Sequence, residues 1–223
     1  ISSGYREKGY YPEAFINMLA LLGWNPGTNQ EIFSMDELIQ AFSLERVSKS
    51  GAKFDPEKTK WFNQQYLRKE SNEVLAKQFD AILKKQGFNA ELNYIEKVCG
   101  LIKEKAYFPN DLWSLGYYFF HKPEVYDKEV VKKRWKDEAP VFIEKLTAAY
   151  KQLDDFSPAE TERVFKETAT AMNINPGSLM QLFRVCLSGE AGGPVLFDMV
   201  ALLGREEVVE RLNIAINTIS AEV

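Results

Sequence analysis

The sequence contains few histidines and cysteines, the side chains that serve most often as catalytic base, thiol nucleophile or zinc ligand. Its one histidine, His121, stands beside Lys122, and its two cysteines, Cys99 and Cys186, lie 87 positions apart. A Ser/His/Asp or Cys/His mechanism would have to use His121, and a structural zinc ion needs about four cysteine or histidine ligands. We therefore predict no catalytic residue and no metal site here, a surface or half-buried histidine, and two buried free thiols in a reducing cytosol.

Charge is the second possible source of function. The chain has 223 residues with 28 Lys and Arg and 32 Asp and Glu, a net charge of −4. An acidic balance argues against non-specific nucleic-acid binding, which usually needs a basic face. However, 22 of the 28 cations lie in the first 150 residues, and residues 151–223 carry a net charge of −5. Specific nucleic-acid recognition through a few Lys or Arg side chains at defined positions therefore stays open.

Two further patterns suggest nucleic-acid binding but have simpler interpretations. Lys132, Lys133, Arg134 and Lys136 form a dense basic run, which we interpret as a solvated helix face rather than a nucleic-acid patch. Aromatic residues gather at Trp61-Phe62, at Trp113 and over 117–120. Their helical spacing and apolar neighbours favour core packing over stacking on bases.

The elements that must position these residues are predicted to be helices. Ser34-x-x-Glu37 and Ser157-x-x-Glu160 have the pattern of capping boxes. Apolar residues recur at helical spacing, and no alternation typical of a strand or fixed-period repeat is found. We predict an all-α fold of ten to eleven helices, and the longest apolar stretch, 15–22, is too short to cross a membrane. Helix starts are expected at or just after Pro12, Ser34, Asp55, Ser71, Asn110, Asp127, Pro140, Ser157 and Asn175.

A short lysine motif suggests nucleotide chemistry. Val47-Ser48-Lys49-Ser50 resembles the Lys-Met-Ser-Lys-Ser loop of class I aminoacyl-tRNA synthetases, in which a lysine neutralises phosphate charge. The first lysine and the methionine are missing, and the accompanying His-x-Gly-His type motif cannot exist with one histidine. No Walker A sequence is present. We expect no ATP site in this chain.

Three longer strings carry a more specific resemblance. They are residues 4–24 (GYREKGYYPEAFINMLALLGW), 46–67 (RVSKSGAKFDPEKTKWFNQQYL) and 182–204 (LFRVCLSGEAGGPVLFDMVALLG). In order and spacing they are similar to the part of bacterial glutamyl-tRNA synthetases that follows the catalytic domain. In that family the ATP-binding lysine loop lies just upstream. The resemblance implies a chain that starts after the active site, and the absence of an initiator methionine or leader before Ile1 likewise predicts a fragment.

The resemblance also implies a domain organisation. Residues 1–70 resemble the small helical stem-contact domain that touches the inner corner of tRNA. Residues 71–223 resemble the α-helical cage that binds the anticodon, either as one body or as two subdomains with a break near 150–157. The junction is expected within 69–72, where Lys-Glu-Ser-Asn separates two helical patterns.

Candidate binding residues follow from the same resemblance. It implies that Arg184, Gly193, Pro194 and Leu196 lie against anticodon bases, where a guanidinium stacks on a base or bonds its edge and a glycine turn allows close approach. Lys105 stands where some members have a base-reading arginine, and lysine cannot reproduce the bidentate fork. Phosphate contacts near the tRNA corner are expected from four lysines: Lys49, Lys53, Lys58 and Lys60.

The implied function is the tRNA-recognition part of a glutamate–tRNA ligase. The expected partners are the tRNA for glutamate and the protein's own catalytic domain, with ATP and Mg used only by the full-length enzyme. We expect a cytoplasmic monomer without a membrane partner. The alternative is a helical scaffold of synthetase ancestry that binds proteins, which the acidic last third would suit. A basic track along one side of the fold would favour RNA.

Overall fold

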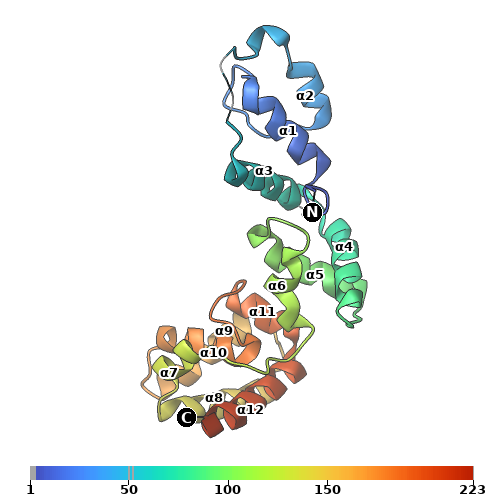
Figure 1. Ribbon diagram of the computed structural model, residues 1–223. Coiled ribbons are helices and arrows are strands. Elements are labelled where there is room, and N and C mark those ends of the chain that lie inside the picture. Colours follow the sequence, from blue (N-terminus) through green and yellow to red (C-terminus); the bar gives the residue numbers. More distant parts are fainter. Residues whose placement is uncertain (1–3, 50, 52, 223) are drawn as a thin grey trace. The chain divides into compact units, whose positions relative to one another are not determined.

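The chain folds into helices joined by turns, as the computed structural model shows for residues 4–49, 51 and 53–222 (Figure 1). Within these residues there are twelve α-helices and no strand; the sole sheet-like pairing described is an isolated bridge between Trp24 and Val47. The predicted all-α fold is confirmed, with slightly more helices than expected. Ser50 and Ala52 of the lysine-rich string lie outside the described residues.

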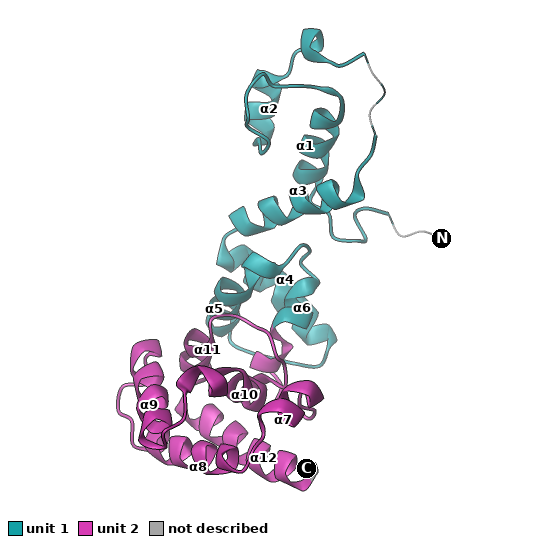
Figure 2. Cartoon of the chain, turned by 90° about the vertical axis from the view of Figure 1, so that its left-hand side faces the viewer, with its two compact units in different colours: residues 1–115 teal, residues 116–223 magenta. Residues whose placement is uncertain are grey.

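Two compact units make up the chain, residues 1–115 and residues 116–223 (Figure 2). The junction predicted at 69–72 lies inside the first unit, where α3 ends and Ser71 caps α4. That junction stays a prediction about functional domains. The first unit contains α1 (Pro12–Gly23), α2 (Met35–Ala41), η1 (Leu44–Arg46), α3 (Pro56–Lys69), α4 (Asn72–Lys85), α5 (Leu92–Ile102), η2 (Lys103–Lys105) and most of α6 (Asp111–Gly116). The second contains η3 (Tyr117–Phe119), α7 (Lys128–Arg134), α8 (Glu138–Lys151), α9 (Pro158–Ala171), α10 (Pro176–Ser188), α11 (Leu196–Leu203) and α12 (Arg205–Glu222).

Side-chain caps start many of these helices at the predicted residues. Ser34 forms a complete capping box, because its Oγ accepts from Glu37 N at 3.2 Å while Glu37 Oε2 accepts from Ser34 N at 2.7 Å. The hydrogen bonds from the backbone and hydroxyl of Ser34 lower the pKa of the Glu37 carboxyl. One expected start is wrong: α8 begins at Glu138, two residues before Pro140. Proline is tolerated within the first turn because those N–H groups have no intrahelical acceptor.

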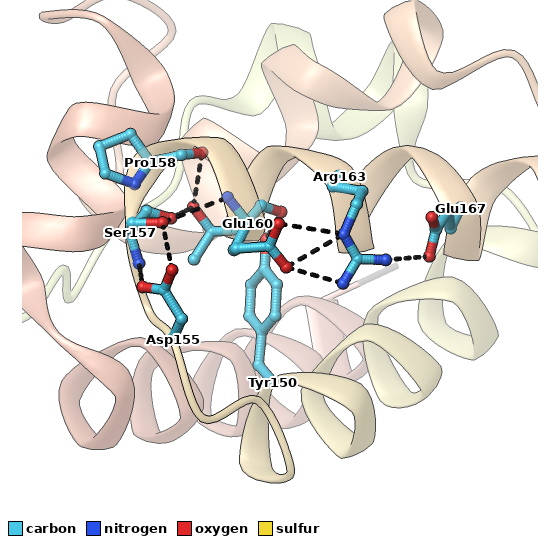
Figure 3. A network of polar contacts seen from close by, with 8 residues as sticks. Tyr150, Asp155, Ser157, Pro158, Glu160, Arg163 and Glu167 are labelled. Carbon is cyan, nitrogen blue, oxygen red and sulfur yellow. Dashed lines mark hydrogen bonds and ion pairs between the residues drawn. The ribbon is translucent and has the colours of Figure 1, made fainter.

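The second predicted capping box is only half formed (Figure 3). Ser157 Oγ accepts from Glu160 N at 3.4 Å, but the Glu160 carboxylate binds Arg163 at 2.8 Å instead of reaching back. Asp155 takes that role and accepts from Ser157 N at 2.9 Å. The local charge pair therefore redirects the side chain that the sequence pattern assigns to the cap.

Aromatic rings fill the core of the second unit. Tyr150 on α8 is fully buried, and its hydroxyl donates to Thr161 O on α9 at 2.8 Å (Figure 3). Burial raises the pKa of this phenol. Phe165 stacks near Phe142 and Phe183, with ring centroids 5.2 and 5.0 Å away. These contacts join α8, α9 and α10.

Buried asparagines organise the first unit. Asn63 on α3 accepts from Tyr11 N at 2.8 Å, next to the start of α1, and donates to Tyr107 O at 2.6 Å. Arg68 on the same helix donates to Glu104 O at 2.6 Å and lies 3.1 Å from its carboxylate. α3 thereby fixes the turn over 103–107, which carries the candidate residue Lys105.

Candidate nucleic-acid interface

Arg184 lies on α10, a helix whose sequence sets its orientation. Asn175 caps the start, with its Oδ1 accepting from Gly177 N at 2.9 Å, and Pro176 occupies the first helical position. Leu182, Phe183 and their neighbour Cys186 are fully buried. Because these residues hold the inner face in the core, Arg184 is left half-buried at the edge of that face.

The Arg184 guanidinium, the Tyr118 hydroxyl and the backbone turn at Gly193 lie close together beside α10. A Cβ atom added to Gly193 would stand 2.7 Å from Arg184 Nη1 and 3.3 Å from Tyr118 Oη. A side chain at Gly193 would therefore require the Arg184 guanidinium to move, whereas glycine leaves it in place. The structure thus brings together Arg184 and Gly193, two of the predicted residues, and adds Tyr118.

The convergence leaves hydrogen-bonding capacity unused. Arg184 Nη1 and Tyr118 Oη are both buried, and neither has a hydrogen-bond partner among the described residues. Burial lowers the pKa of Arg184 and raises that of Tyr118, although the arginine stays charged. Buried polar atoms without partners cost about 1–3 kcal/mol each. A ligand that offers hydrogen-bonding groups at this turn would recover that cost.

Pro194 and Leu196 occupy the same turn but with their side chains turned inward. Pro194 is buried, and Leu196 at the start of α11 is 8% exposed. Val195 between them is 66% exposed. A contact from Pro194 or Leu196 to a base would therefore have to involve their backbone or their exposed edge, and their role stays a prediction.

Gly189 ends α10 and turns the chain toward this site. Its φ is +79°, and a Cβ atom there would lie 2.6 Å from Val125 O, a backbone atom that cannot swing away. We predict that Gly189→Ala lowers the free energy of unfolding of the second unit by about 2–4 kcal/mol, combining backbone strain and the clash. Urea denaturation followed by far-UV circular dichroism measures it.

Gly87 provides the control for that substitution. It follows α4 with a φ of +86°, Phe88 N donates to Leu83 O at 2.9 Å as at a left-handed helix end, and nothing lies within 4 Å of its Cβ position. Gly87→Ala should therefore cost only the strain of the left-handed conformation, about 1–2 kcal/mol. Equal losses for the two variants would show that the contact with Val125 has no energetic importance.

A buried arginine supports the site from the other side. Arg211 on α12 is 2% exposed, and its Nη1 donates to both Tyr118 O and Leu187 O at 2.7 Å. Its Nε pairs with Glu207 at 2.7 Å. Arg211 therefore connects the backbone of the segment that carries Tyr118 to the last turn of α10.

Lys105 belongs to the first unit and lies in η2. It is exposed, on the turn that Arg68 and Asn63 hold through backbone carbonyls. Gln64 adds a longer contact to Glu104 O at 3.4 Å. These hydrogen bonds hold the backbone of the turn in place, so the side chain of Lys105 extends toward a ligand from a fixed position. Its contact with an anticodon base stays a prediction.

The four lysines predicted to contact phosphate differ in their surroundings. Lys49 and Lys53 are exposed. Lys58 pairs with Glu31 at 2.9 Å, and Lys60 Nζ sits 4.4 Å from the centre of the Tyr107 ring. Lys53 and Lys58 share a depression of about 270 Å³ between α1 and α3. The structure therefore brings these two together, while Lys58 already has a carboxylate partner.

His121 and the two cysteines form no catalytic arrangement in the described part of the chain. His121 is half-buried, with Nε2 3.4 Å from Glu124. Cys99 and Cys186 are buried free thiols, as predicted, and burial raises their pKa to about 12. No group of three metal-ligating side chains and no helix long and apolar enough to span a membrane occurs among residues 4–49, 51 and 53–222.

Sequence reasoning missed two residues of this site. Tyr118 lies in the aromatic run that we interpreted as core, and its burial is indeed nearly complete. Nothing in the sequence separates its hydroxyl from that of the adjacent Tyr117, which donates to Glu190 at 2.9 Å. Arg211 follows Glu207 by four residues, a spacing equally typical of an exposed ion pair on a helix surface.

Two protein-family models match this chain, and together they cover residues 1–216. The family model described as "Anticodon binding domain" matches residues 56–216. The model described as "tRNA synthetases class I (E and Q), catalytic domain" matches residues 1–61, which covers most of the segment predicted to contact the tRNA stem. The two models overlap at the start of α3.

Relatives and solved structures agree with this assignment. The glutamate–tRNA ligase of Flavobacterium johnsoniae is 48% identical over 98% of this chain and 44% of its own length. That of Phocaeicola vulgatus is 46% identical over 98% and 43%. The crystal structure of a glutamate tRNA ligase from Elizabethkingia meningosepticum in complex with its amino acid has a TM-score of 0.92 and 43% identity, covering 98% of this chain and 43% of that one.

The chain spans less than half the length of the relatives that it matches. The resemblance to glutamyl-tRNA synthetases that its sequence strings carry is confirmed. Because the anticodon-binding model covers well over half of its residues, the chain belongs to the anticodon binding domain family, and the relatives it resembles are glutamate–tRNA ligases.

Proposed function

We propose that this chain recognises the tRNA for glutamate as part of a longer glutamate–tRNA ligase, and that it engages the anticodon loop. The observation that supports this most directly is the pair of buried, unpartnered polar atoms, Arg184 Nη1 and Tyr118 Oη, beside the Gly193 turn. RNA is read in loops, where unstacked bases offer their edges to such groups. Arg184, Gly193 and Tyr118 are therefore the residues most directly involved.

The rest of the machinery belongs to the longer protein. ATP and Mg would be used there, and the missing catalytic part would be this chain's covalent neighbour. The first unit would contact the inner corner of the tRNA through Lys49, Lys53 and Lys60, and Lys105 would approach the loop. The proposal also includes a monomer acting in the cytosol, where uncharged tRNA is available.

A binding titration tests the proposal. We expect fluorescence anisotropy to detect binding of the chain to labelled tRNA for glutamate, weaker as salt rises and weaker for a tRNA with an altered anticodon. The purified chain should show no glutamate-dependent pyrophosphate exchange. Exchange activity would contradict the assignment of catalysis to the missing part. Absence of RNA binding would favour the protein-binding scaffold.

A further inference from the structure

The α7 basic cluster is the densest concentration of positive charge in the second unit. We define it as Lys128, Lys132, Lys133, Arg134 and Lys136, five cations within nine residues that contain one acid, Glu129. The remainder of residues 116–223 carries eight cations and sixteen acids. Positive charge is therefore gathered on one element of an acidic unit.

The cluster is not neutralised by neighbouring carboxylates. Among the described residues, no ion pair forms to any of its five members. Four of them are exposed and Arg134 is half-buried. Four of the eight other cations of the unit bind glutamates: Lys122, Arg163, Lys166 and Arg211. Cations near the end of a helix stabilise its dipole, but that effect alone does not require five charges.

Packing turns the cluster outward. Val130 and Val131 on α7 are buried, as is Trp135 just after it, and α7 packs against α10. Lys132 and Lys133 project from the other side of this short helix. An open depression of about 540 Å³ is lined by Glu129, Val130, Lys132, Lys133 and, from α10, Gln181.

Gln181 links this depression to the arginine site. It is exposed on α10, three residues before Arg184. Residues three apart on a helix are surface neighbours, about 4.5 Å apart along the axis. The depression and Arg184 therefore lie next to each other on a single helix surface.

We propose that the α7 basic cluster, centred on Lys132 and Lys133, is a binding site for RNA backbone phosphates of the strand whose base meets Arg184. The inference deepens the proposed function and rests on it. Phosphate contacts position a strand, whereas base contacts select its sequence. The structure separates the two tasks: Arg184 and Tyr118 meet at the glycine turn, and the exposed lysines line a depression with Gln181, three residues before Arg184 on α10.

The salt dependence of binding tests this site. In the double variant Lys132→Gln, Lys133→Gln, loss of two single-strand phosphate contacts should reduce the slope of log K against log salt by about 1.4. Between 50 and 200 mM KCl the parent should therefore lose about sevenfold more affinity than the variant. The tRNA for glutamate and its anticodon-altered form should weaken by the same factor.

Two further variants make the result specific. Lys145→Gln, Lys151→Gln removes the same charge from exposed positions on α8 and should leave the slope close to the parent value. Glu129→Gln removes the one carboxylate of the depression and should tighten binding of both tRNAs.

The possible outcomes separate the two proposals. Equal slope changes in the α7 and α8 double variants would overturn a specific phosphate site, as would a parent-like slope in the α7 variant. Loss confined to the correct anticodon would overturn it in favour of base reading by the lysines. If the parent chain binds neither tRNA, the proposed function itself fails together with this site.

Discussion

Replacing Arg211 with methionine is expected to lower the free energy of unfolding of the second unit by about 3–5 kcal/mol. Methionine keeps an unbranched apolar stem but is shorter than arginine and removes every donor. Tyr118 O and Leu187 O then lose a 2.7 Å hydrogen bond each, and Glu207 loses its buried-side partner. The loss should be large because two buried carbonyls are left without this donor, although Glu207 keeps Lys122 at 3.7 Å.

Urea denaturation measures this effect, and Arg205→Met is the matched control. Arg205 lies on the same helix, is half-buried and donates one exposed hydrogen bond to Asp154 O at 3.1 Å. Its replacement should cost about 1 kcal/mol or less. If Arg211→Met is no more destabilising than Arg205→Met, the buried network contributes little and the site does not depend on it.

A second substitution separates charge pairing from carbonyl binding. Glu207→Gln retains an oxygen that can accept from Arg211 Nε and leaves the bonds to Tyr118 O and Leu187 O intact. It should therefore cost less than Arg211→Met. The difference between the two variants reports how much of the stability comes from holding backbone carbonyls rather than from opposite charges.

Local chemistry made the helices predictable. Ser34, Asp55, Ser71, Asp127 and Asn175 all cap the helices that their positions predict, because a side-chain oxygen next to unpaired backbone N–H groups is a local interaction. Where a competing partner is near, the pattern fails in detail. Glu160 binds Arg163 rather than completing its capping box, because both are within one turn.

Long-range polar contacts were beyond prediction from one sequence. Asn63 joins Tyr11 N and Tyr107 O, which are 52 and 44 positions away. Arg211 reaches Tyr118 O across 93 positions. Such pairs depend on how helices pack, and an asparagine or arginine on a helix has the same local pattern whether its partners are protein groups or water. The candidate Arg184 came from a family resemblance, whereas its buried neighbour Tyr118 came only from the fold.

Arg184→Lys should weaken binding to the tRNA for glutamate nearly as much as Arg184→Ala, by about 1–3 kcal/mol. The reason is geometric. Arginine presents a planar fork whose Nη1 lies at the Gly193 turn, beside Tyr118 Oη. Lysine keeps the positive charge but offers a single point donor that cannot stack on a base or bond two of its edge atoms. Anisotropy titrations of parent and variants measure the loss.

Selectivity decides between base reading and simple charge attraction at Arg184. If its guanidinium contacts a base, both substitutions should reduce the preference for the correct anticodon over an altered one. If it contacts only phosphate, lysine should largely restore binding and all tRNAs should weaken together. Circular dichroism must first show an intact fold, because Leu182, Phe183 and Cys186 around it are fully buried. Arg205→Lys in the same unit should bind every tRNA like the parent. Parent-like binding of Arg184→Lys to every tRNA would show that Arg184 does not read a base.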